Sequence, residues 1–373
     1  MKKDARTPTV ELKGVVKRFG KVVAVEKMDL TIEEGSFVTL LGPSGCGKTT
    51  ILRMIAGLET PTEGEIYIKG KLVNEIPIHK RNLGMIFQNY ALFPHKTIFD
   101  NVAFSLKYKG VPKPDIKKKV ERALEMVRLP GVERRMPAQL SGGQQQRIAL
   151  ARAIVMEPIV LLMDEPLSAL DENLREEMRR EIGNLQDVLG ITTIFVTHDQ
   201  REALSMSDKI VVMKDGIMQQ EGNPEVVYNY PANHFVADFL GHSNFFDATV
   251  VSQEENLCVV KLDDGTELRV QHPGDWEVGG KVELVVRAQK VEIAARERNS
   301  SGPEMNRFLG KIKERSYMGG EVSYFVELGN QTILHVINMS KARPLQEGQE
   351  VSVRVPPEQC GLLSKEEGST ALR

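Results

Sequence analysis

The sequence predicts two domains, an α/β domain over residues 1–240 and an all-β domain over residues 241–373. Up to about residue 240, short apolar stretches alternate with longer helical patterns, as in a mostly parallel sheet covered by helices. From about Asn244, short strands alternate with turns, which is typical of a small barrel or a pair of barrels. The length of 373 residues agrees with this division, because one ordinary core rarely extends over so long a chain.

Composition argues against a nucleic-acid-binding protein, a disulfide-rich protein and a membrane-spanning protein. The formal net charge is −2 with 27% charged residues, so there is no electrostatic case for non-specific nucleic-acid binding. Cys46, Cys258 and Cys360 have neither metal-ligand spacing nor an even count, which favours a reducing compartment. Residues 1–6 are charged with no apolar stretch behind them, and the chain has no run of about 18 apolar residues. We therefore expect neither a secretory signal nor a membrane-spanning segment.

A strand, a loop and a helix follow one another between residues 37 and 57. The apolar residues 37–41 predict a buried strand, and residues 50–56 predict a helix that ends at Gly57. Between them, residues 42–49 match the pattern G-x-x-x-x-G-K-[ST] of phosphate-binding loops. In such a loop Lys48 reaches the β- and γ-phosphates, Thr49 ligates Mg²⁺, and the helix N-terminus faces the phosphates. A chance match occurs in roughly one chain in a hundred of this length, and the flanking elements make chance less probable still.

Polar residues follow three further apolar stretches. Gln88 comes after residues 84–87, Asp164 and Glu165 end the strand predicted over residues 159–165, and His198 follows residues 191–197. Because ligands bind at the carboxyl ends of strands in open α/β sheets, we expect these side chains beside the phosphate loop. Asp164 is assigned to the Mg²⁺ shell, Glu165 to polarising the attacking water, and His198 to the γ-phosphate or Glu165. Each alone is more often an ordinary strand-end or surface residue.

Residues 140–144, Leu-Ser-Gly-Gly-Gln, form a second motif directly before a strong helical pattern over residues 145–154. Ser141, Gly142 and Gly143 therefore lie at a helix N-terminus, which favours an anion. Serine and glycine also begin many helices without binding anything. A chance match to all five residues is roughly one in two thousand on average composition.

Two amphipathic helices are expected to be structural. One is predicted to begin at Asp115 as its cap, directly after Pro114. The other covers residues 172–189 and stops at Gly190. In the C-terminal domain, residues 257–262 and 267–270 predict a β-hairpin around the turn at residues 263–265. Further strands are predicted over residues 282–286, 291–294, 321–328, 332–337 and 350–355.

Taken in this order, the motifs resemble those of the ATPase subunits of ATP-binding cassette (ABC) importers, and the resemblance covers essentially the whole chain. It implies a P-loop NTPase cassette with a RecA-like core and a helical subdomain over about residues 89–157. It also implies that residues 241–373 form an OB-like regulatory domain of the TOBE type. Residues 315–320 and 244–250 look closest to the polyamine (spermidine/putrescine) branch. Sugar, ferric iron and phosphonate import are the alternatives. Arg287-Ala288-Gln289 stands where many relatives have Arg-Pro-Glu, a departure that counts against a subfamily assignment.

The resemblance assigns site residues for ATP and Mg²⁺. Phe19 is expected to stack on adenine, and Asp171 closes the turn at residues 168–171. The nucleotide-binding residues are Phe19, Gly42, Pro43, Ser44, Gly45, Cys46, Gly47, Lys48, Thr49, Thr50, Ser141, Gly142, Gly143, Gln144 and Asp171. The catalytic residues are Glu165, His198 and Gln88, and the metal-site residues are Thr49, Gln88 and Asp164.

The resemblance also implies partners. Two copies are expected to pair head to tail, so that Ser141 and Gly143 of one chain cap the γ-phosphate held by Lys48 of the other. Residues 88–106 match the surface that receives a helix of a membrane permease, and a solute-binding protein acts indirectly. The expected location is peripheral, on the cytoplasmic face of the inner membrane. The alternatives are a soluble ABC ATPase of DNA repair or translation, and an oligonucleotide-binding β domain, which a missing basic-aromatic stripe disfavours.

Overall fold

The computed structural model describes residues 8–271, 274–295, 305–329, 331–340 and 343–365, so the charged N-terminal residues 1–6 lie outside it. The chain divides into two compact units, Met1–Asn229 and Tyr230–Arg373. This division precedes the boundary expected at residue 240. The reason is that helix α9 (His234–Phe239) buries Ala237 against Val285 and Leu363 of the second unit.

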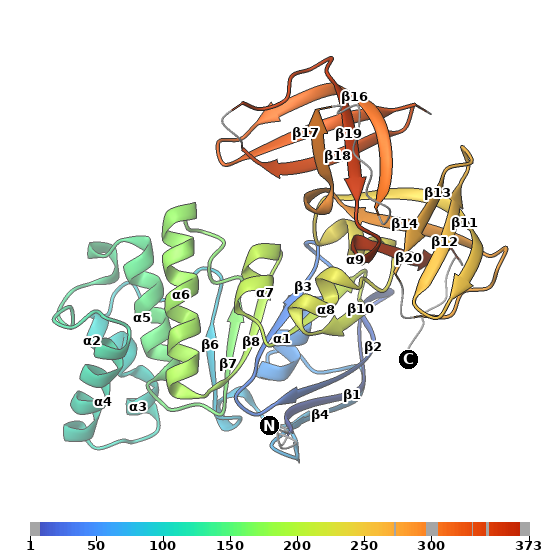
Figure 1. Cartoon of the computed structure of the whole chain (residues 1–373). Coiled ribbons are helices and arrows are strands. Elements are labelled where there is room, and N and C mark those ends of the chain that lie inside the picture. The colour runs from blue at the N-terminus through green and yellow to red at the C-terminus, as the bar shows by residue number, and fades with distance from the viewer. Residues whose placement is uncertain (1–7, 272–273, 296–304, 330, 341–342, 366–373) are drawn as a thin grey trace. The chain divides into compact units, whose positions relative to one another are not determined.

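The first unit is built on a six-stranded sheet in the order β10-β9-β3-β8-β7-β6 (Figure 1). Its strands are β3 (Phe37–Leu41), β6 (Leu83–Ile86), β7 (Val160–Asp164), β8 (Thr192–Thr197), β9 (Lys209–Lys214) and β10 (Ile217–Gly222). Only the edge strand β10 runs antiparallel to its neighbour, so the predicted mostly parallel sheet is confirmed. Every residue of β3, β7 and β8 is buried, as expected for strands covered on both faces.

A second sheet in this unit was not predicted. It is antiparallel, in the order β2-β1-β4-β5, with β1 (Pro8–Phe19), β2 (Val22–Glu33), β4 (Glu63–Ile68) and β5 (Lys71–Leu72). Helix α1 (Lys48–Ala56) shares one core with strands of both sheets, through Ile51, Leu52 and Ile55 among others. Cys46 of the phosphate loop belongs to the same core.

The helices mostly follow the predicted limits. Helix α1 ends at Gly57, whose φ is 83°, and α6 (Glu172–Leu189) ends at Gly190, whose φ is 61°. The predicted cap at Asp115 is wrong. Helix α4 (Lys113–Met126) begins two residues earlier, with Pro114 in its first turn. Proline is tolerated there because the first backbone N–H groups of a helix have no partner to lose.

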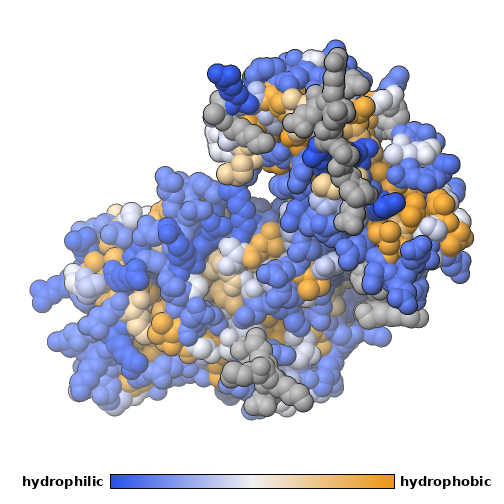
Figure 2. Space-filling view, in the orientation of Figure 1, coloured by the Kyte–Doolittle hydropathy of each residue, from blue (hydrophilic) through white to orange (hydrophobic). Residues whose placement is uncertain are grey.

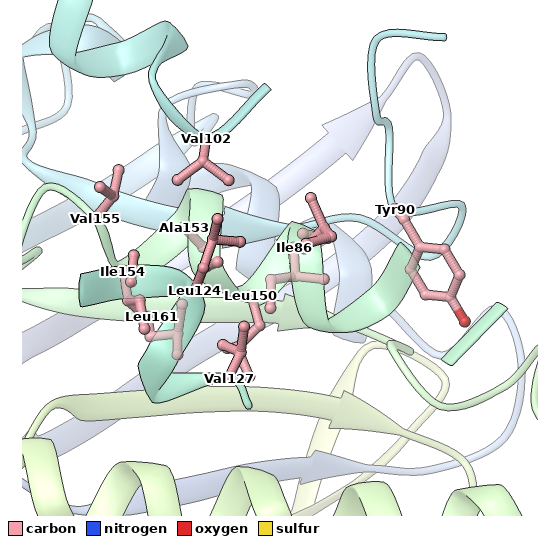
Figure 3. Packing of buried hydrophobic residues seen from close by; sticks show 14 of the residues in the cluster. Ile86, Tyr90, Val102, Leu124, Val127, Leu150, Ala153, Ile154, Val155 and Leu161 are labelled. Carbon is pink, nitrogen blue, oxygen red and sulfur yellow. The ribbon is translucent and has the colours of Figure 1, made fainter. Parts of the chain in front are cut away.

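Four helices lie between β6 and β7 in the chain: α2 (Ile98–Val102), α3 (Phe104–Tyr108), α4 and α5 (Gly142–Ile154). Figure 3 shows part of their common apolar core, in which Val102, Leu124 and Leu150 come together from three of these helices. The same core includes Ile86 and Leu161 of the parallel sheet, so these helices are anchored to the strands that carry the site. The remaining helices of this unit are α7 (Gln200–Met206) and α8 (Pro224–Asn229).

The second unit contains two antiparallel five-stranded sheets, in the orders β13-β12-β11-β14-β20 and β15-β19-β16-β17-β18. One core of mainly aliphatic residues includes side chains from both sheets. The first sheet consists of β11 (Ser243–Glu254), β12 (Leu257–Leu262), β13 (Glu267–Val270), β14 (Lys281–Arg287) and β20 (Cys360–Ser364). The second consists of β15 (Glu292–Ala295), β16 (Asn306–Tyr317), β17 (Glu321–Leu328), β18 (Ile333–Met339) and β19 (Glu350–Val355). The predicted hairpin is confirmed as β12 and β13.

Polar residues predominate on the face of the molecule seen in Figure 2, with apolar residues interspersed among them. None of the helices in the described part of the chain is both long and apolar enough to cross a membrane.

Candidate nucleotide site

The register of the parallel sheet brings the predicted site residues to one edge. Leu41 pairs with Thr197, Asp164 with Val196, and Ile86 with Met163. Strands β3, β6, β7 and β8 therefore end side by side. The loops that follow them carry the phosphate loop, Gln88, Glu165 and His198 toward the same edge.

The phosphate loop (residues 42–49) approaches its surroundings too closely for side chains at two positions. A Cβ on Gly42 would lie 2.3 Å from the carbonyl oxygen of Met213, and one on Gly47 would lie 2.4 Å from that of Ala24. Gly45, with φ of 83°, faces open space and has a left-handed backbone conformation that glycine adopts more easily than other residues do. Ser44 is exposed and Pro43 is partly buried, while Thr50 lies in the first turn of α1.

Lys48 folds back over this loop and is 4% exposed. Its Nζ donates hydrogen bonds to the carbonyl oxygens of Gly42 (2.7 Å) and Pro43 (2.8 Å). Cys46 Sγ lies 3.7 Å from the same Nζ, and burial raises the pKa of this thiol, although the lysine charge opposes the rise. The ammonium group is thus held at the centre of the loop, and the Cys46 side chain packs beneath it.

Thr49 and Asp164 are in direct contact. The Thr49 Oγ1 hydroxyl donates a 2.8 Å hydrogen bond to Asp164 Oδ1. Asp164 is 7% exposed, and burial raises the pKa of its carboxyl, while the Thr49 hydrogen bond acts in the opposite direction. A hydroxyl and a carboxylate joined in this way form two of the oxygen ligands that Mg²⁺ prefers.

Glu165 is surrounded by the other predicted catalytic residues. Its Oε2 lies 3.4 Å from Gln88 Nε2, which donates to it, and 3.4 Å from His198 Nδ1. Gln88 Nε2 also donates to Ser168 Oγ at 3.4 Å, and Ser168 Oγ donates to the Glu165 carbonyl oxygen at 2.9 Å. The backbone of Glu165 has a φ of 44°, which is strained for a non-glycine residue and common at functional sites.

Two further predicted residues lie at the margins. Asp171 caps α6 by accepting a 3.0 Å hydrogen bond from the Leu174 amide. Phe19, at the end of β1, is 47% exposed, and Lys17 Nζ lies 4.6 Å from its ring centroid. An exposed aromatic ring beside a cation is available for stacking, which is what adenine binding requires.

The second motif (residues 140–144) begins α5. Ser141 Oγ accepts from the Gln144 amide and Gln144 Oε1 accepts from the Ser141 amide, a reciprocal cap. Gly142 is exposed, whereas a Cβ on Gly143 would meet the Leu174 methyl groups at 2.9 Å. In the described chain no hydrogen bond or ion pair joins residues 141–144 to the phosphate loop, and Figure 1 shows α5 and α1 apart. The two motifs do not form one site within one chain.

The structure also brings in residues that sequence reasoning missed. Arg175 Nη2 donates to the Leu170 carbonyl oxygen at 3.0 Å, and its Nη1 lies 3.6 Å from Asp199 Oδ2. Glu202, which is 4% exposed, accepts a 2.6 Å hydrogen bond from Thr197 Oγ1, and burial raises the pKa of its carboxyl. These contacts tie the segment around His198 to the turn before α6. The only available signal was spacing, since Arg175 and Glu202 each follow a predicted site residue, Asp171 and His198, by four positions.

A cavity of about 700 Å³ lies elsewhere, beside Ile159 and Thr192 at the amino ends of β7 and β8. It is lined by several charged side chains that already pair with each other, among them Lys69 with Glu34 and Lys119 with Glu157. It is separate from the residues described above.

The residues present fit a nucleotide with its metal. Gly42 and Gly47 leave no room for side chains in the loop, and the N-terminus of α1 follows it directly. Backbone N–H groups and a lysine therefore share one loop, as a phosphate site requires. The Thr49 hydroxyl, the Asp164 carboxylate and the Gln88 amide supply oxygen donors, which suits Mg²⁺ rather than a softer metal.

Comparisons with known proteins agree with this geometry. Residues 25–168 match the sequence profile of the ABC transporter family, and residues 284–363 match that of the TOBE domain. The spermidine/putrescine import ATP-binding protein of Rubrobacter xylanophilus is 45% identical over 371 residues, which cover 98% of this chain and 97% of that protein. The Fe(3+) ions import ATP-binding protein of Rhizobium etli is also 45% identical, over 344 residues that cover 92% and 94%.

Solved structures resemble part of the chain. The dimeric structure of a bacterial ABC transporter cassette has a TM-score of 0.52 and 34% identity, over 58% of this chain and 98% of that one. The structure of cbiO1 from Clostridium perfringens, part of an ABC transporter complex, has a TM-score of 0.56 and 29% identity, over 59% and 90%.

Proposed function

The chain belongs to the ABC transporter family, and from this premise we propose that it is the ATP-hydrolysing subunit of a polyamine importer. The observation that carries the ATPase assignment is the meeting of Gln88, Glu165 and His198 at one point, with both contacts to Glu165 Oε2 at 3.4 Å. A carboxylate held between an amide and an imidazole is suited to orienting and polarising a water molecule.

Each site residue is assigned a role in ATP binding or hydrolysis. Lys48 and the N–H groups of the phosphate loop bind the β- and γ-phosphates, and Phe19 stacks on adenine. Thr49, Asp164 and Gln88 hold Mg²⁺, which when bound draws charge from the transferred phosphoryl group. Glu165 polarises the attacking water. His198 orients Glu165 and leaves its second ring nitrogen available to the γ-phosphate.

We propose that two copies bind ATP between them, head to tail. The exposed, anion-favouring start of α5 has no phosphate-binding partner of its own in the described chain. In the homodimer Ser141 and Gly143 of one copy would face the phosphates held by Lys48 of the other. The likeness to a dimeric ABC cassette structure supports this arrangement.

The permease contact is assigned to residues 88–106. In this segment Phe93 and Phe104 pack ring against ring at 4.7 Å, and Phe104 is 43% exposed. A partly exposed aromatic pair is suited to receiving an apolar helix. The chain would then lie on the cytoplasmic face of the inner membrane as a peripheral subunit, and a solute-binding protein would act on it through the permease.

Polyamine is proposed as the solute because relatives named for spermidine and putrescine import match 98% and 85% of the chain. Ferric iron is the second candidate, because a relative named for Fe(3+) import is equally identical. The solute is bound by the other subunits, so the ATPase geometry is the same for either.

The test is reconstitution in vesicles with the permease and solute-binding protein that co-purify with the chain. We expect spermidine-loaded binding protein to stimulate ATP hydrolysis and uptake, and ferric iron or maltose to have no effect. Stimulation by ferric iron alone would transfer the assignment to iron import. A complex carrying Glu165→Gln serves as the control that assembles without turnover.

A further inference from the structure

Two consecutive residues after Gln88 have a left-handed backbone. Tyr90 has a φ of 59° and Ala91 a φ of 47°, and neither is glycine. L-residues avoid this region because Cβ approaches the following carbonyl oxygen, and alanine has no polar side chain to offset the cost. The turn is closed locally, since the Tyr90 amide donates to the Phe87 carbonyl oxygen at 2.8 Å and the Ala91 amide to that of Asn89 at 2.7 Å. Something outside the turn must hold it in this form.

Arg152 of α5 makes the contacts that hold it. Its Nη1 donates to the Ala91 carbonyl oxygen and its Nη2 to the Tyr90 carbonyl oxygen, both at 2.7 Å. Its guanidinium carbon also lies 5.9 Å from the ring centroid of Phe93. One planar guanidinium group thus donates hydrogen bonds to the carbonyl oxygens of both strained residues, a bidentate geometry that lysine cannot provide.

The rest of the turn is fixed on either side. Figure 3 shows the Tyr90 ring at the margin of the helical core, where the side chain is 8% exposed. Asn101 of α2, which is fully buried, accepts from the Phe93 amide at 2.8 Å and donates to the Phe93 carbonyl oxygen at 3.1 Å. With Phe93 held by α2 and the Tyr90–Ala91 peptides held by α5, the path of the chain back to Gln88 is determined.

We propose that Arg152 is a positioning residue. By holding Tyr90 and Ala91 in the left-handed conformation, it determines where the Gln88 side chain lies in the site. Arg152 lies on α5, whose N-cap is Ser141. This one helix therefore connects the Gln88 segment to the residues proposed to cap the γ-phosphate in the partner's site. This inference rests on the proposed function for the role of Gln88, but the clamp itself does not. The two are therefore tested by different measurements.

The clamp is tested by hydrogen–deuterium exchange of the full chain without nucleotide. We expect Arg152→Lys, which can reach only one carbonyl, to speed exchange at the amides of residues 89–92 about tenfold. Arg147→Lys is the matched control, because Arg147 lies on the same helix but pairs with Glu177 and Glu181. Unchanged exchange in Arg152→Lys, or equal changes in both variants, would overturn the proposal.

The consequence for Gln88 is tested by steady-state ATP hydrolysis. We expect Arg152→Lys to lower kcat about tenfold and to raise the Mg²⁺ concentration needed for half-maximal rate, with the KM for ATP unchanged because the phosphate loop is untouched. Ala91→Gly, which removes the backbone penalty, should restore much of the rate in the Arg152→Lys background. A purely structural role predicts loss of thermal stability without this rescue.

A second variant guards against a misfolded Arg152→Lys. Ala91→Val leaves Arg152 in place but puts a β-branched residue into the left-handed region, and it should reproduce the same faster exchange and lower kcat. Wild-type protein without any ATP turnover would refute the proposed function while leaving the exchange result to decide the clamp. Faster exchange with an unchanged kcat in a fully active enzyme would overturn the link to Gln88.

Discussion

The Oγ1 hydroxyl of Thr49 donates a 2.8 Å hydrogen bond to the Asp164 carboxylate, across 115 residues of sequence. The bond joins the start of α1 to the end of β7, two elements whose order along the sheet edge is set by the parallel register. Two groups proposed to share one metal ion are therefore in contact in the protein alone. The arrangement holds the carboxylate in a buried place where its charge is costly.

Asp164→Asn should stabilise the nucleotide-free protein at neutral pH and abolish ATP hydrolysis. Burial raises the pKa of Asp164 in the folded chain above its unfolded value, so the folded state binds the proton more tightly. The stability that this tighter proton binding contributes is therefore fully present below about pH 4, near the unfolded pKa. It is lost as the pH rises through the folded pKa. Asparagine keeps the Thr49 hydrogen bond without the charge, and we expect a gain of about 1 kcal/mol at pH 7.5.

Urea unfolding of this variant at pH 7.5 and at pH 4.5 measures the effect. The gain should shrink at the lower pH, because a raised pKa means that protonation of the wild-type carboxyl removes the buried charge as the pH falls. Asp187→Asn, at an exposed position on α6, is the control and should change stability little at either pH. An equal gain at both pH values would contradict the assigned cause.

Glu165→Gln should lower ATP hydrolysis by about a hundredfold, because an uncharged amide cannot polarise water. ATP binding should stay intact, because it is assigned to Lys48 and the phosphate loop. Phosphate release measures the rate, and size-exclusion chromatography with ATP and Mg²⁺ should show the variant held as a dimer. Glu121→Gln, on the exposed face of α4, serves as the control for losing a carboxylate. Retention of wild-type turnover would remove Glu165 from the catalytic role.

Mixing two inactive variants tests whether one ATP site is built from two chains. Lys48→Ala disables the phosphate loop, and Gly143→Trp blocks the start of α5, where even a Cβ would meet Leu174. In a mixed dimer one site combines the intact Lys48 of one chain with the intact Gly143 of the other. ATP occlusion should therefore return to roughly a quarter of the wild-type level, since about half of the dimers are mixed and each has one good site. No recovery would indicate that the motifs do not meet across chains.

Gly42→Ala and Gly45→Ala should differ in cost although both lie in the phosphate loop. At Gly42 the new Cβ would lie 2.3 Å from a β9 carbonyl oxygen, and backbone cannot move away cheaply. We expect a loss of about 2 kcal/mol or more for Gly42→Ala and about 1 kcal/mol for Gly45→Ala, which meets only the cost of its positive φ. Chemical unfolding of the full chain measures both, and equal losses would contradict the steric argument.

The sequence predicted the elements whose signals are local. Helix ends marked by Gly57 and Gly190, and the strands with continuous apolar runs such as β7, were found where expected. Strand β16 was missed because most of its residues are at least partly exposed and show no clear alternation. The cap at Asp115 was wrong because Pro114 is accommodated in the first turn of α4, which begins at Lys113.

By itself the sequence determined where the phosphate-loop pattern and the second motif stand and which elements follow them, because both motifs are defined by residue type and spacing within a short stretch of chain. Only the tertiary structure decided which side chains meet. The 3.4 Å contacts of Glu165 join segments far apart in sequence, and so do the hydrogen bonds from Arg152 to Tyr90 and Ala91. Such contacts depend on strand register and on the path of the backbone between elements, and no local pattern encodes either of them.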